Sequence, residues 1–249
     1  MKKKAFVIGS NSKKSLSPLI FNYWFKQNNI NGEYSFIEIK TENFDKQIHS
    51  VLRTKGLCGL NVTIPYKEKI IDKIDTLTEH AKIIGAVNCV SVSKNLISGT
   101  NTDWIGFLES IKKQTQQKIK KSAVVLGYGG ASKAVVYALK EYGFNEIKIF
   151  NRSHKKTEHL INDTQIKVIN KKNLLEEIYD SEIVINTTPV NILEDLDIHT
   201  KEIDITACDI VYTPRDTSFL SHFRKERRIY GIHMLVYQAI PCFKEWFGV

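Results

Sequence analysis

The sequence predicts an α/β protein of two domains, and three observations support this prediction. Strand-like apolar runs alternate with amphipathic, helix-like segments along the whole chain, as in parallel sheets whose strands are joined by helices. The alternation starts again near residue 122, so two units in series fit better than one. The length of 249 residues allows one large or two modest domains, at roughly 150 residues per domain.

The first unit is predicted to alternate between strand and helix. Its predicted elements are, in chain order, the strand KAFVIG, the helix PLIFNYWFKQNN, the strand YSFIEI, the helix ENFDKQIHSVLRT and the strand LCGLNVTI. A helix is then predicted to start near Thr102, and the polar, lysine-rich stretch after it is predicted to link the two units.

The second unit is predicted to begin with a strand, a glycine turn and a helix over 122–143. Further strands are predicted at EIKIFNRS, IKVIN, SEIVINTTP and ACDIVY. The last segment, HMLVYQAIPCFKEWFGV, has helical spacing except at Pro241, which should kink the helix or separate two helices.

The composition is that of a folded globular protein, with 42% hydrophobic and 25% charged residues. No apolar run approaches the about 18 residues that a membrane span needs. The apolar run after the opening MKKK ends at Gly9, short of the about 7 to 15 residues of a signal-peptide core. A cytoplasmic protein without a membrane partner is therefore expected.

The cysteines argue against a metal site, and the distribution of charge argues against a nucleic-acid partner. The four cysteines, at positions 58, 89, 208 and 242, have no metal-ligand spacing, so we expect buried thiols and no metal site. The net charge of +9 comes from lysines scattered in pairs rather than gathered in one stripe, so no nucleic-acid partner is expected. A positive field would instead attract an anionic small molecule.

A glycine turn lies between the first strand of the second unit and the helix after it. Gly127, Gly129 and Gly130 follow the apolar run SAVVL, and Ser132 occupies a third small position. In this setting the turn matches a dinucleotide site, where the backbone approaches a pyrophosphate at a helix N-terminus. The alternative is a tight turn without a ligand.

The end of the next strand indicates which dinucleotide. NAD sites usually carry an acidic residue there, but this strand ends in Asn151, Arg152 and Ser153, and Lys156 follows. Guanidinium binds phosphate oxygens in a bidentate, charge-assisted fashion, so the pattern favours the 2′-phosphate of NADP. The alternative is that Arg152 is a surface charge.

Two serines mark the start of the first predicted helix. Ser17 is predicted as its N-cap, with Pro18 at the first helical position. Capping does not explain Ser15, and two hydroxyls beside the free amides of a helix N-terminus also suit a carboxylate. Capping and ligand binding both stay open from the residues alone.

Polar residues also follow the apolar segments of the first unit. Asn61 and Thr63 alternate along a strand end, so their side chains should share one face. Because ligands of α/β proteins bind at strand ends, a shared cavity is predicted for four polar clusters, which contribute Ser15, Ser17, Asn61, Thr63, Lys67, Asn88, Asn101, Thr102 and Asp103.

Lys67 and Asp103 suggest proton chemistry in that cavity. Hydride transfer to a ketone creates an alkoxide, and a positioned ammonium can protonate it while stabilising the developing charge. Asp103 would hold the lysine and bind a substrate hydroxyl. Alternatively, Lys67 is a solvated surface lysine and Asp103 only stabilises a helix N-terminus.

With these residues assembled, the chain resembles the shikimate dehydrogenase family from FVIGSNSKKSLSP to MLVYQAIPCFKEWFG. Six family motifs occur in order: Ser-x-Ser-Pro, Asn-Val-Thr-x-Pro-x-Lys, Gly-Ala-x-Asn, Asn-Thr-Asp, Gly-x-Gly-Gly-Ala and Asn-Arg-Ser. The resemblance implies an NADP-dependent reduction of 3-dehydroshikimate to shikimate, on the route through chorismate to the aromatic amino acids.

The resemblance also implies roles for individual residues. Lys67 and Asp103 would be the catalytic pair, and Ser15 and Ser17 would bind the substrate carboxylate. The ring hydroxyls would be held by Asn61, Thr63, Asn88 and Gln238, with Tyr212 and Gln238 closing the site from the second half of the chain. The cofactor would contact Gly127, Gly129, Gly130, Ala131, Asn151, Arg152, Ser153, Lys156, Thr187 and Gly231.

The domain division follows from the same resemblance. Residues 1–103 and 233–249 would form a discontinuous substrate-binding domain, and 104–232 a Rossmann-type NADP-binding domain, with a cleft between them. The chain departs from the family pattern at four positions, Asn11, Lys14, Cys89 and Asn191. None of these departures removes a predicted catalytic group.

Two other functions remain as alternatives. One is a quinate/shikimate dehydrogenase that prefers NAD, and the other is a regulatory, nucleotide-binding homologue without catalysis. The sequence does not decide between a monomer and a homodimer.

Overall fold

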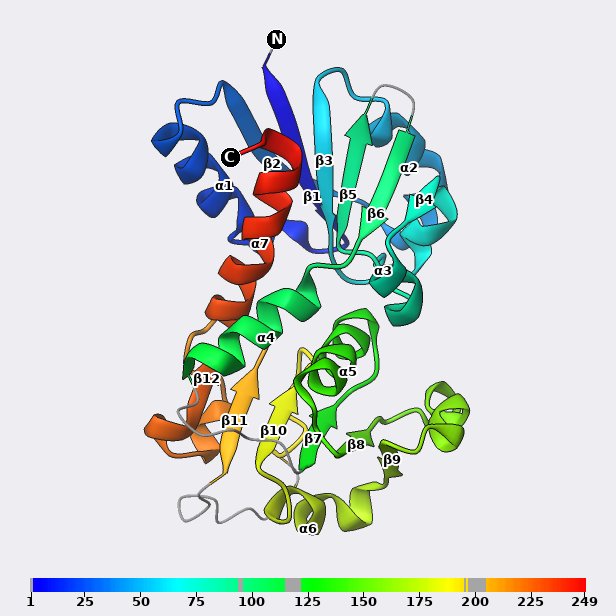
Figure 1. Cartoon of the computed structure of the whole chain (residues 1–249), viewed down its shortest axis with the longest axis vertical. Coiled ribbons are helices and arrows are strands. Elements are labelled where there is room, and N and C mark those ends of the chain that lie inside the picture. The colour runs from blue at the N-terminus through cyan, green and yellow to red at the C-terminus, as the bar shows by residue number, and fades with distance from the viewer. Residues whose placement is uncertain (1, 94–95, 115–121, 195, 197–204) are drawn as a thin grey trace. The chain divides into compact units, whose positions relative to one another are not determined.

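The computed structural model describes residues 2–93, 96–114, 122–194, 196 and 205–249. The chain divides into two compact units (Figure 1). The first contains Met1–Thr102 and Gln238–Val249, and the second contains Asp103–Tyr237. Compared with the sequence-based division, residue 103 and residues 233–237 therefore change sides. Each unit is built on one six-stranded sheet covered by helices, which confirms the predicted α/β class.

The first sheet is mixed. Its strands are β1 (Lys3–Gly9), β2 (Gly32–Glu38), β3 (Leu57–Val62), β4 (Thr76–Leu77), β5 (Cys89–Ser93) and β6 (Leu96–Thr100), in the spatial order β2-β1-β3-β5-β6-β4. β5 runs antiparallel to both of its neighbours, so the prediction of a parallel sheet is wrong for this strand. Only two residues separate β5 from β6, and a connection that short joins antiparallel neighbours.

Helices cover both faces of this sheet. They are α1 (Ser17–Gln27), α2 (Phe44–Leu52), α3 (Glu79–Ile84) and part of α7 (Gly231–Phe247), with 3₁₀ turns η1 (Ser12–Lys14), η2 (Thr41–Asn43) and η3 (Lys69–Lys73). Side chains of α1 and α7 pack together on one face, and those of α2 and η3 pack on the other. Apolar side chains from alternate positions of β1 enter the two cores, as the strand period requires.

The second sheet is parallel throughout. Its strands are β7 (Ser122–Leu126), β8 (Glu146–Phe150), β9 (Ile166–Ile169), β10 (Ile183–Asn186), β11 (Thr206–Asp209) and β12 (Arg228–Tyr230), in the order β12-β11-β10-β7-β8-β9. Counted from β7, this is the dinucleotide-binding order 3-2-1-4-5-6. The order reverses between β7 and β10, where such folds bind their ligand.

Helices lie on both faces of the second sheet as well. They are α4 (Asp103–Gln114), α5 (Gly130–Tyr142) and α6 (Leu174–Tyr179), with 3₁₀ turns η4 (His154–Lys156), η5 (Glu158–Asn162), η6 (Lys171–Asn173), η8 (Leu220–His222) and η9 (Lys225–Arg227). α4 and α5 share one core, and α6 packs in the other. None of the described helices is long and apolar enough to cross a membrane.

Three local predictions are resolved by the structure. The helix expected near Thr102 begins at Asp103, and the predicted linker after it lies at 115–121, outside the described residues. The final segment is one continuous helix with Pro241 inside it, so Pro241 does not separate two helices. Of the four cysteines, Cys58 is only half-buried, whereas the other three are buried thiols as expected.

Candidate active site

Asn61 lies at the end of β3 and uses both ends of its side chain. It is 5% exposed. The Tyr34 hydroxyl donates to its Oδ1 at 2.7 Å. Its Nδ2 donates to the Asn88 carbonyl at 3.1 Å and to the Cys242 Sγ at 3.3 Å. The carboxamide is therefore held in one orientation by β2, α7 and the segment before β5.

Asn88 joins two further segments of the chain, those of Thr102 and Gln238. Its Nδ2 donates to the Thr102 Oγ1 at 2.9 Å and to the Gln238 Oε1 at 3.0 Å. Its Oδ1 accepts the Thr102 backbone N–H at 2.6 Å. We call Tyr34, Asn61, Asn88, Thr102, Gln238 and Cys242 the amide network. All six belong to the first unit.

The antiparallel course of β5 explains why the two asparagines meet. Asn61 pairs with Cys89 in the β3–β5 register, so β5 starts at the edge where β3 ends. Asn88 precedes Cys89 and therefore lies beside Asn61. A parallel β5 would have started at the opposite edge, away from Asn61.

Lys67 follows a turn at the end of β3. The Tyr66 backbone N–H donates to the Thr63 carbonyl at 3.0 Å, and the Ile64–Pro65 peptide between them is cis. The Lys67 carbonyl accepts the Val87 N–H at 2.7 Å, which ties the lysine to the segment that carries Asn88. Lys67 and Thr63 are both half-buried.

Thr63 shares the face of Asn61. A Cβ on Gly9 would lie 2.4 Å from the Thr63 methyl group, and a Cβ on Gly59 would lie 2.2 Å from the Trp246 ring. Gly59 and Asn61 both face α7, through Trp246 and Cys242 respectively. Position 63 continues this alternation, as predicted from the strand period. Gly59 is required here because any side chain would displace the α7 indole.

The two serines form a pair at the start of α1. The Ser15 Oγ donates to the Ser17 Oγ at 3.1 Å and accepts the Ser17 backbone N–H at 3.2 Å. α1 begins at Ser17 with Leu16 in the cap position, so the prediction that Ser17 is the N-cap is wrong. Ser15 satisfies the first amide instead, because Leu16 has no polar side chain. Both hydroxyls lie at the helix N-terminus, where an anion is favoured.

Asp103 is the first residue of α4 and is buried. It directly follows Thr102, whose backbone N–H and hydroxyl both bond to Asn88. Asp103 itself belongs to the second unit. Its position in the first turn also suits the helix dipole, so both of its predicted roles stay open.

The glycine turn lies at the point where the second sheet reverses its strand order. Gly127 has φ +98°, and a Cβ there would lie 2.7 Å from the Thr188 methyl group and 2.9 Å from the Thr187 Oγ1. Glycine is required for both reasons. The Ser132 Oγ donates to the Gly127 carbonyl at 2.6 Å, and the Thr187 Oγ1 donates to the Leu126 carbonyl at 2.6 Å. These bonds fix the turn on both sides.

The residues at this turn fit a pyrophosphate. α5 begins at Gly130, and Ala131 is its second residue. The first amides of the helix point out of its N-terminus. A Cβ on Gly129 would meet nothing within 4 Å. The backbone is therefore open to a phosphate at this position.

The residues after β8 fit a second phosphate. The Asn151 Nδ2 donates to the Ser153 carbonyl at 2.7 Å and closes a turn. Arg152, Ser153 and Lys156 are exposed. This donor set is cationic and contains no carboxylate, which matches a 2′-phosphate and not a free ribose hydroxyl.

Asp209 is a residue that the sequence analysis missed. It ends β11 and is 1% exposed. Its Oδ1 accepts the Val211 N–H at 3.0 Å and the Asn186 Nδ2 at 3.2 Å, and its Oδ2 accepts the Thr217 hydroxyl. Burial raises the pKa of Asp209, although these three hydrogen bonds act in the opposite direction.

Asp209 connects the two loops at the ends of β10 and β11. Asn186 also donates to the Thr188 and Val190 carbonyls, at 3.2 and 3.3 Å, next to the predicted cofactor residue Thr187. The other loop, 210–217, contains the half-buried Tyr212. We call Asn186, Asp209, Val211 and Thr217 the carboxylate network. Its sequence signal, an aspartate ending a buried strand, was present in ACDIVY.

The structure explains the residue types at two further positions near these loops, Gly231 and Asn191. A Cβ on Gly231, at the start of α7, would lie 2.5 Å from the Ile210 carbonyl oxygen, so this predicted cofactor residue is also required by packing. Asn191 stands where the family pattern has glycine. It has no positive φ, and its Oδ1 accepts the Leu193 N–H at 3.1 Å.

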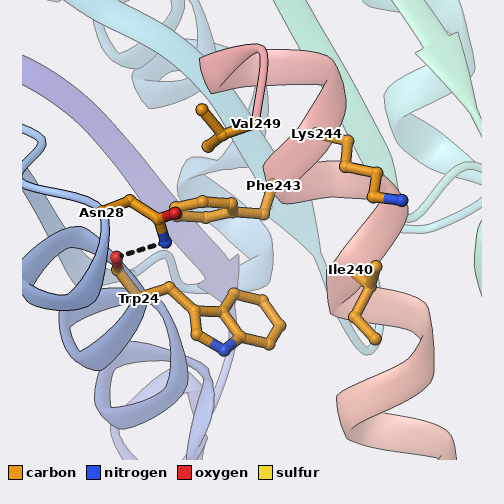
Figure 2. A pocket seen from close by; sticks show the side chains of 6 residues that line it. All are labelled: Trp24, Asn28, Ile240, Phe243, Lys244 and Val249. Atoms are coloured by element: carbon orange, nitrogen blue, oxygen red, sulfur yellow. Dashed lines mark hydrogen bonds between the residues drawn. The ribbon is translucent and has the colours of Figure 1, made fainter.

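A surface hollow of about 150 Å³ lies between α1 and α7, and Figure 2 shows the side chains that line it. Its lining is mainly apolar and consists of Trp24, Asn28, Ile240, Phe243, Lys244 and Val249. None of these residues belongs to the predicted site. The amide of Asn28 donates to the Trp24 carbonyl at 2.9 Å, so it is already paired.

Two family models match this chain, one in each part of it. The family model described as the shikimate dehydrogenase substrate binding domain matches residues 7–90, and the model described as shikimate / quinate 5-dehydrogenase matches 109–216. A shikimate dehydrogenase (NADP(+)) of Bartonella quintana is 33% identical over 99% of this chain and 88% of its own length. The chain belongs to the shikimate dehydrogenase family.

Solved structures of the shikimate dehydrogenase family share the fold. The Aquifex aeolicus shikimate dehydrogenase is 35% identical and superposes with a TM-score of 0.88 over 100% of this chain and 93% of its own. The Thermus thermophilus enzyme, solved in complex with NADP(H) and shikimate, is 28% identical with a TM-score of 0.85 over 99% and 94%. The resemblance stated from the motifs is thereby confirmed.

Proposed function

We propose that this protein is an NADP-dependent shikimate dehydrogenase, which reversibly reduces 3-dehydroshikimate to shikimate with NADPH. Such an enzyme is an oxidoreductase that acts on a CH–OH group. Relatives of this chain are named shikimate dehydrogenase (NADP(+)). The product of this enzyme feeds chorismate and aromatic amino acid biosynthesis. The structural observation that carries the proposal is the amide network, which brings Asn61, Asn88 and Gln238 together from three distant segments.

The proposed chemistry divides between the two units. In the first unit, Ser15 and Ser17 would bind the substrate carboxylate at the α1 N-terminus, and Asn61, Thr63, Asn88 and Gln238 would orient the ring hydroxyls. In the second unit, Tyr212 would contribute a further substrate contact. The substrate-binding and cofactor-binding domains of the family are thus proposed to correspond to these units.

The proton would be handled by Lys67 and Asp103. NADP supplies the hydride acceptor or donor when it is bound, so the protein must supply or remove one proton at the reacting oxygen. The Lys67 ammonium would donate this proton in the reduction and stabilise the developing negative charge. The Asp103 carboxylate would accept hydrogen bonds from the Lys67 ammonium and from a hydroxyl of shikimate.

The cofactor would be held by the second unit alone. Gly127, Gly129, Gly130 and Ala131 would surround the pyrophosphate at the α5 N-terminus, near Thr187 and Gly231. Asn151, Arg152, Ser153 and Lys156 would bind the 2′-phosphate. The exposed guanidinium and ammonium groups after β8 support this assignment.

The remaining proposals concern partners and location. A small-molecule substrate is supported by the relatives, and we propose no nucleic-acid partner. We also propose that the protein is a monomer or a homodimer. Analytical sedimentation would distinguish these two states. Free thiols at all four cysteines are in keeping with a cytoplasmic location.

One assay tests substrate and cofactor together. The absorbance of the reduced nicotinamide would be followed with shikimate and quinate, each with NADP⁺ and NAD⁺. Shikimate with NADP⁺ should give the highest kcat/KM. A clear preference for NAD⁺ would overturn the Arg152 assignment, and no turnover of either acid would favour a regulatory homologue.

The proton-transfer role has its own variant. Lys67→Met should lower kcat about 10²- to 10⁴-fold, with a smaller change in the KM for shikimate. Lys55→Met is the matched control, because Lys55 is an exposed lysine of the same unit, and its kinetics should equal wild type. Unchanged turnover in Lys67→Met would remove the lysine from proton transfer.

A further inference from the structure

Tyr34 is the member of the amide network that β2 contributes, and its ring and backbone are held by α1. It is 2% exposed, and its ring stacks on Phe21 with the centroids 4.2 Å apart. Its backbone N–H donates to the Asn22 Oδ1 at 3.0 Å, and its carbonyl accepts the Asn22 Nδ2 at 2.8 Å. α1 therefore fixes both the backbone and the ring, and the hydroxyl has a defined place at Asn61.

The Tyr34 hydroxyl distinguishes the two ends of the Asn61 carboxamide. The oxygen and the nitrogen of a carboxamide are nearly equal in size, so hydrogen bonds decide which way it points. Oδ1 cannot donate, so at 2.7 Å the tyrosine must donate to it. The Nδ2 is thereby directed to the Asn88 carbonyl and the Cys242 Sγ.

We propose that Tyr34 is a positioning residue for the substrate, which acts by fixing the Asn61 carboxamide. The inference rests on the proposed function, in which Asn61 binds a ring hydroxyl of shikimate. Tyr34 itself is buried behind Asn61 and touches no substrate. Its loss should weaken shikimate binding while leaving proton transfer at Lys67 and NADP binding in the second unit unchanged.

The first unit contains a second buried tyrosine that serves as a matched control. Tyr66 is fully buried, and its ring stacks on Phe44 with the centroids 4.4 Å apart. Its hydroxyl donates to the Ile39 backbone carbonyl, which is outside the amide network. Tyr34→Phe and Tyr66→Phe each remove one buried hydroxyl, and only Tyr34→Phe removes a hydrogen bond to Asn61.

The experiment compares wild type, Tyr34→Phe and Tyr66→Phe in shikimate oxidation at saturating NADP⁺. Tyr34→Phe should raise the KM for shikimate about three- to tenfold, as expected for one buried hydrogen bond, with kcat within about twofold. The KM for NADP⁺ should not change. Tyr66→Phe should keep all three values, and both variants should melt at similarly reduced temperatures. Equal shikimate KM values in the two variants would overturn the inference.

A double-mutant cycle shows whether Tyr34 acts through Asn61. In the Asn61→Ala background, Tyr34→Phe should leave the KM for shikimate unchanged, because no carboxamide remains to be fixed. The same three- to tenfold effect in both backgrounds would overturn the inference. Calorimetric titration with shikimate provides a readout that does not depend on turnover, and it should show the same ratio of dissociation constants.

Failure of the proposed function gives a different result. Wild-type protein that neither binds nor oxidises shikimate would overturn the proposed function and the inference with it. Wild-type protein that oxidises shikimate, with Tyr34→Phe indistinguishable from Tyr66→Phe, would overturn the inference alone.

Discussion

The two units bury polar groups of different kinds. Among the described residues of the first unit, every buried polar side chain is uncharged, whereas the second unit buries Asp103, Lys148 and Asp209. The amide network satisfies neutral donors and acceptors with one another. The carboxylate network must instead offset the cost of removing a charge from water.

Lys148 shows how the second unit meets this cost. Its Nζ lies 2.9 Å from the Glu177 Oε2 and 3.2 Å from the Asp180 Oδ2. Burial acts to lower the pKa of Lys148, but the hydrogen bonds and charges of the two carboxylates outweigh it and raise the pKa. The amide network should therefore be insensitive to pH, whereas the stability of the second unit should respond to it.

The largest expected effect comes from removing the buried carboxylate. Asp209→Ala removes the acceptor of the Val211 N–H and the Thr217 hydroxyl and one of the acceptors of the Asn186 amide, and it should lower the free energy of unfolding by about 3 kcal/mol. Asp209→Asn can keep all three contacts, because its Nδ2 can donate to the Thr217 oxygen, and should cost about 1 kcal/mol. Urea unfolding measures both. Equal losses in the two variants would show that these three hydrogen bonds are not what holds the loops.

The matching change in the neutral network should cost less. Asn88→Ala removes the side-chain hydrogen bonds to the uncharged groups of Thr102 and Gln238 and should lower the free energy of unfolding by about 2 kcal/mol. Asn31→Ala, an exposed asparagine of the same unit, is the control and should stay within about 0.5 kcal/mol of wild type. A larger loss in Asn88→Ala than in Asp209→Ala would contradict the distinction between the networks.

The pH dependence of stability sharpens the comparison further. The pKa of Asp209 in the folded protein is raised above its ordinary value of 3.8, so the folded state binds its proton more tightly than the unfolded state. Stability from this group is therefore greatest below that value and is lost as the pH rises through the raised pKa. Wild type should lose stability relative to Asp209→Asn over this window, as urea midpoints at a series of pH values would show. A constant difference across the series would contradict the assignment.

The smallest effect concerns a hydroxyl that belongs to neither network. The buried Ser12 Oγ has no hydrogen-bond partner among the described residues, so Ser12→Ala should raise the free energy of unfolding by about 0.5 to 1 kcal/mol. Ser132→Ala is the matched control, since the Ser132 Oγ donates to the Gly127 carbonyl, and it should lower stability by about 1 kcal/mol. Thermal melts distinguish the two signs.

Much of the second unit could be predicted from the sequence, because its signals are local. The strand, glycine turn and helix over 122–143 occupy a continuous segment, and the positive φ of Gly127 is a property of that turn. The run of buried residues in β7 is also typical of a parallel strand covered on both faces. Asp209 was missed because its partners, Asn186 and Thr217, lie 23 and 8 residues away.

Two local predictions failed in the first unit, one at Pro241 and one at Ser17. Pro241 was expected to break a helix, but α7 continues through it, packed against α1 and the first sheet. Ser17 was expected to cap α1, but the chain enters the helix one residue earlier and Ser15 takes that role. Tertiary packing outweighs the local cost of about 3 kcal/mol at Pro241. The shift at Ser17 is local, because Ser15 lies two residues away.

The sequence by itself determined the α/β class, the family motifs and the face shared by Asn61 and Thr63, because periodicity and turn chemistry are properties of neighbouring residues. Only the tertiary structure decided that β5 runs antiparallel, and this direction brings Asn88 beside Asn61. Tyr34, 27 residues before Asn61, is linked to it only through the order of strands in the sheet. No local pattern contains that order, because it is set by which apolar faces can be buried together.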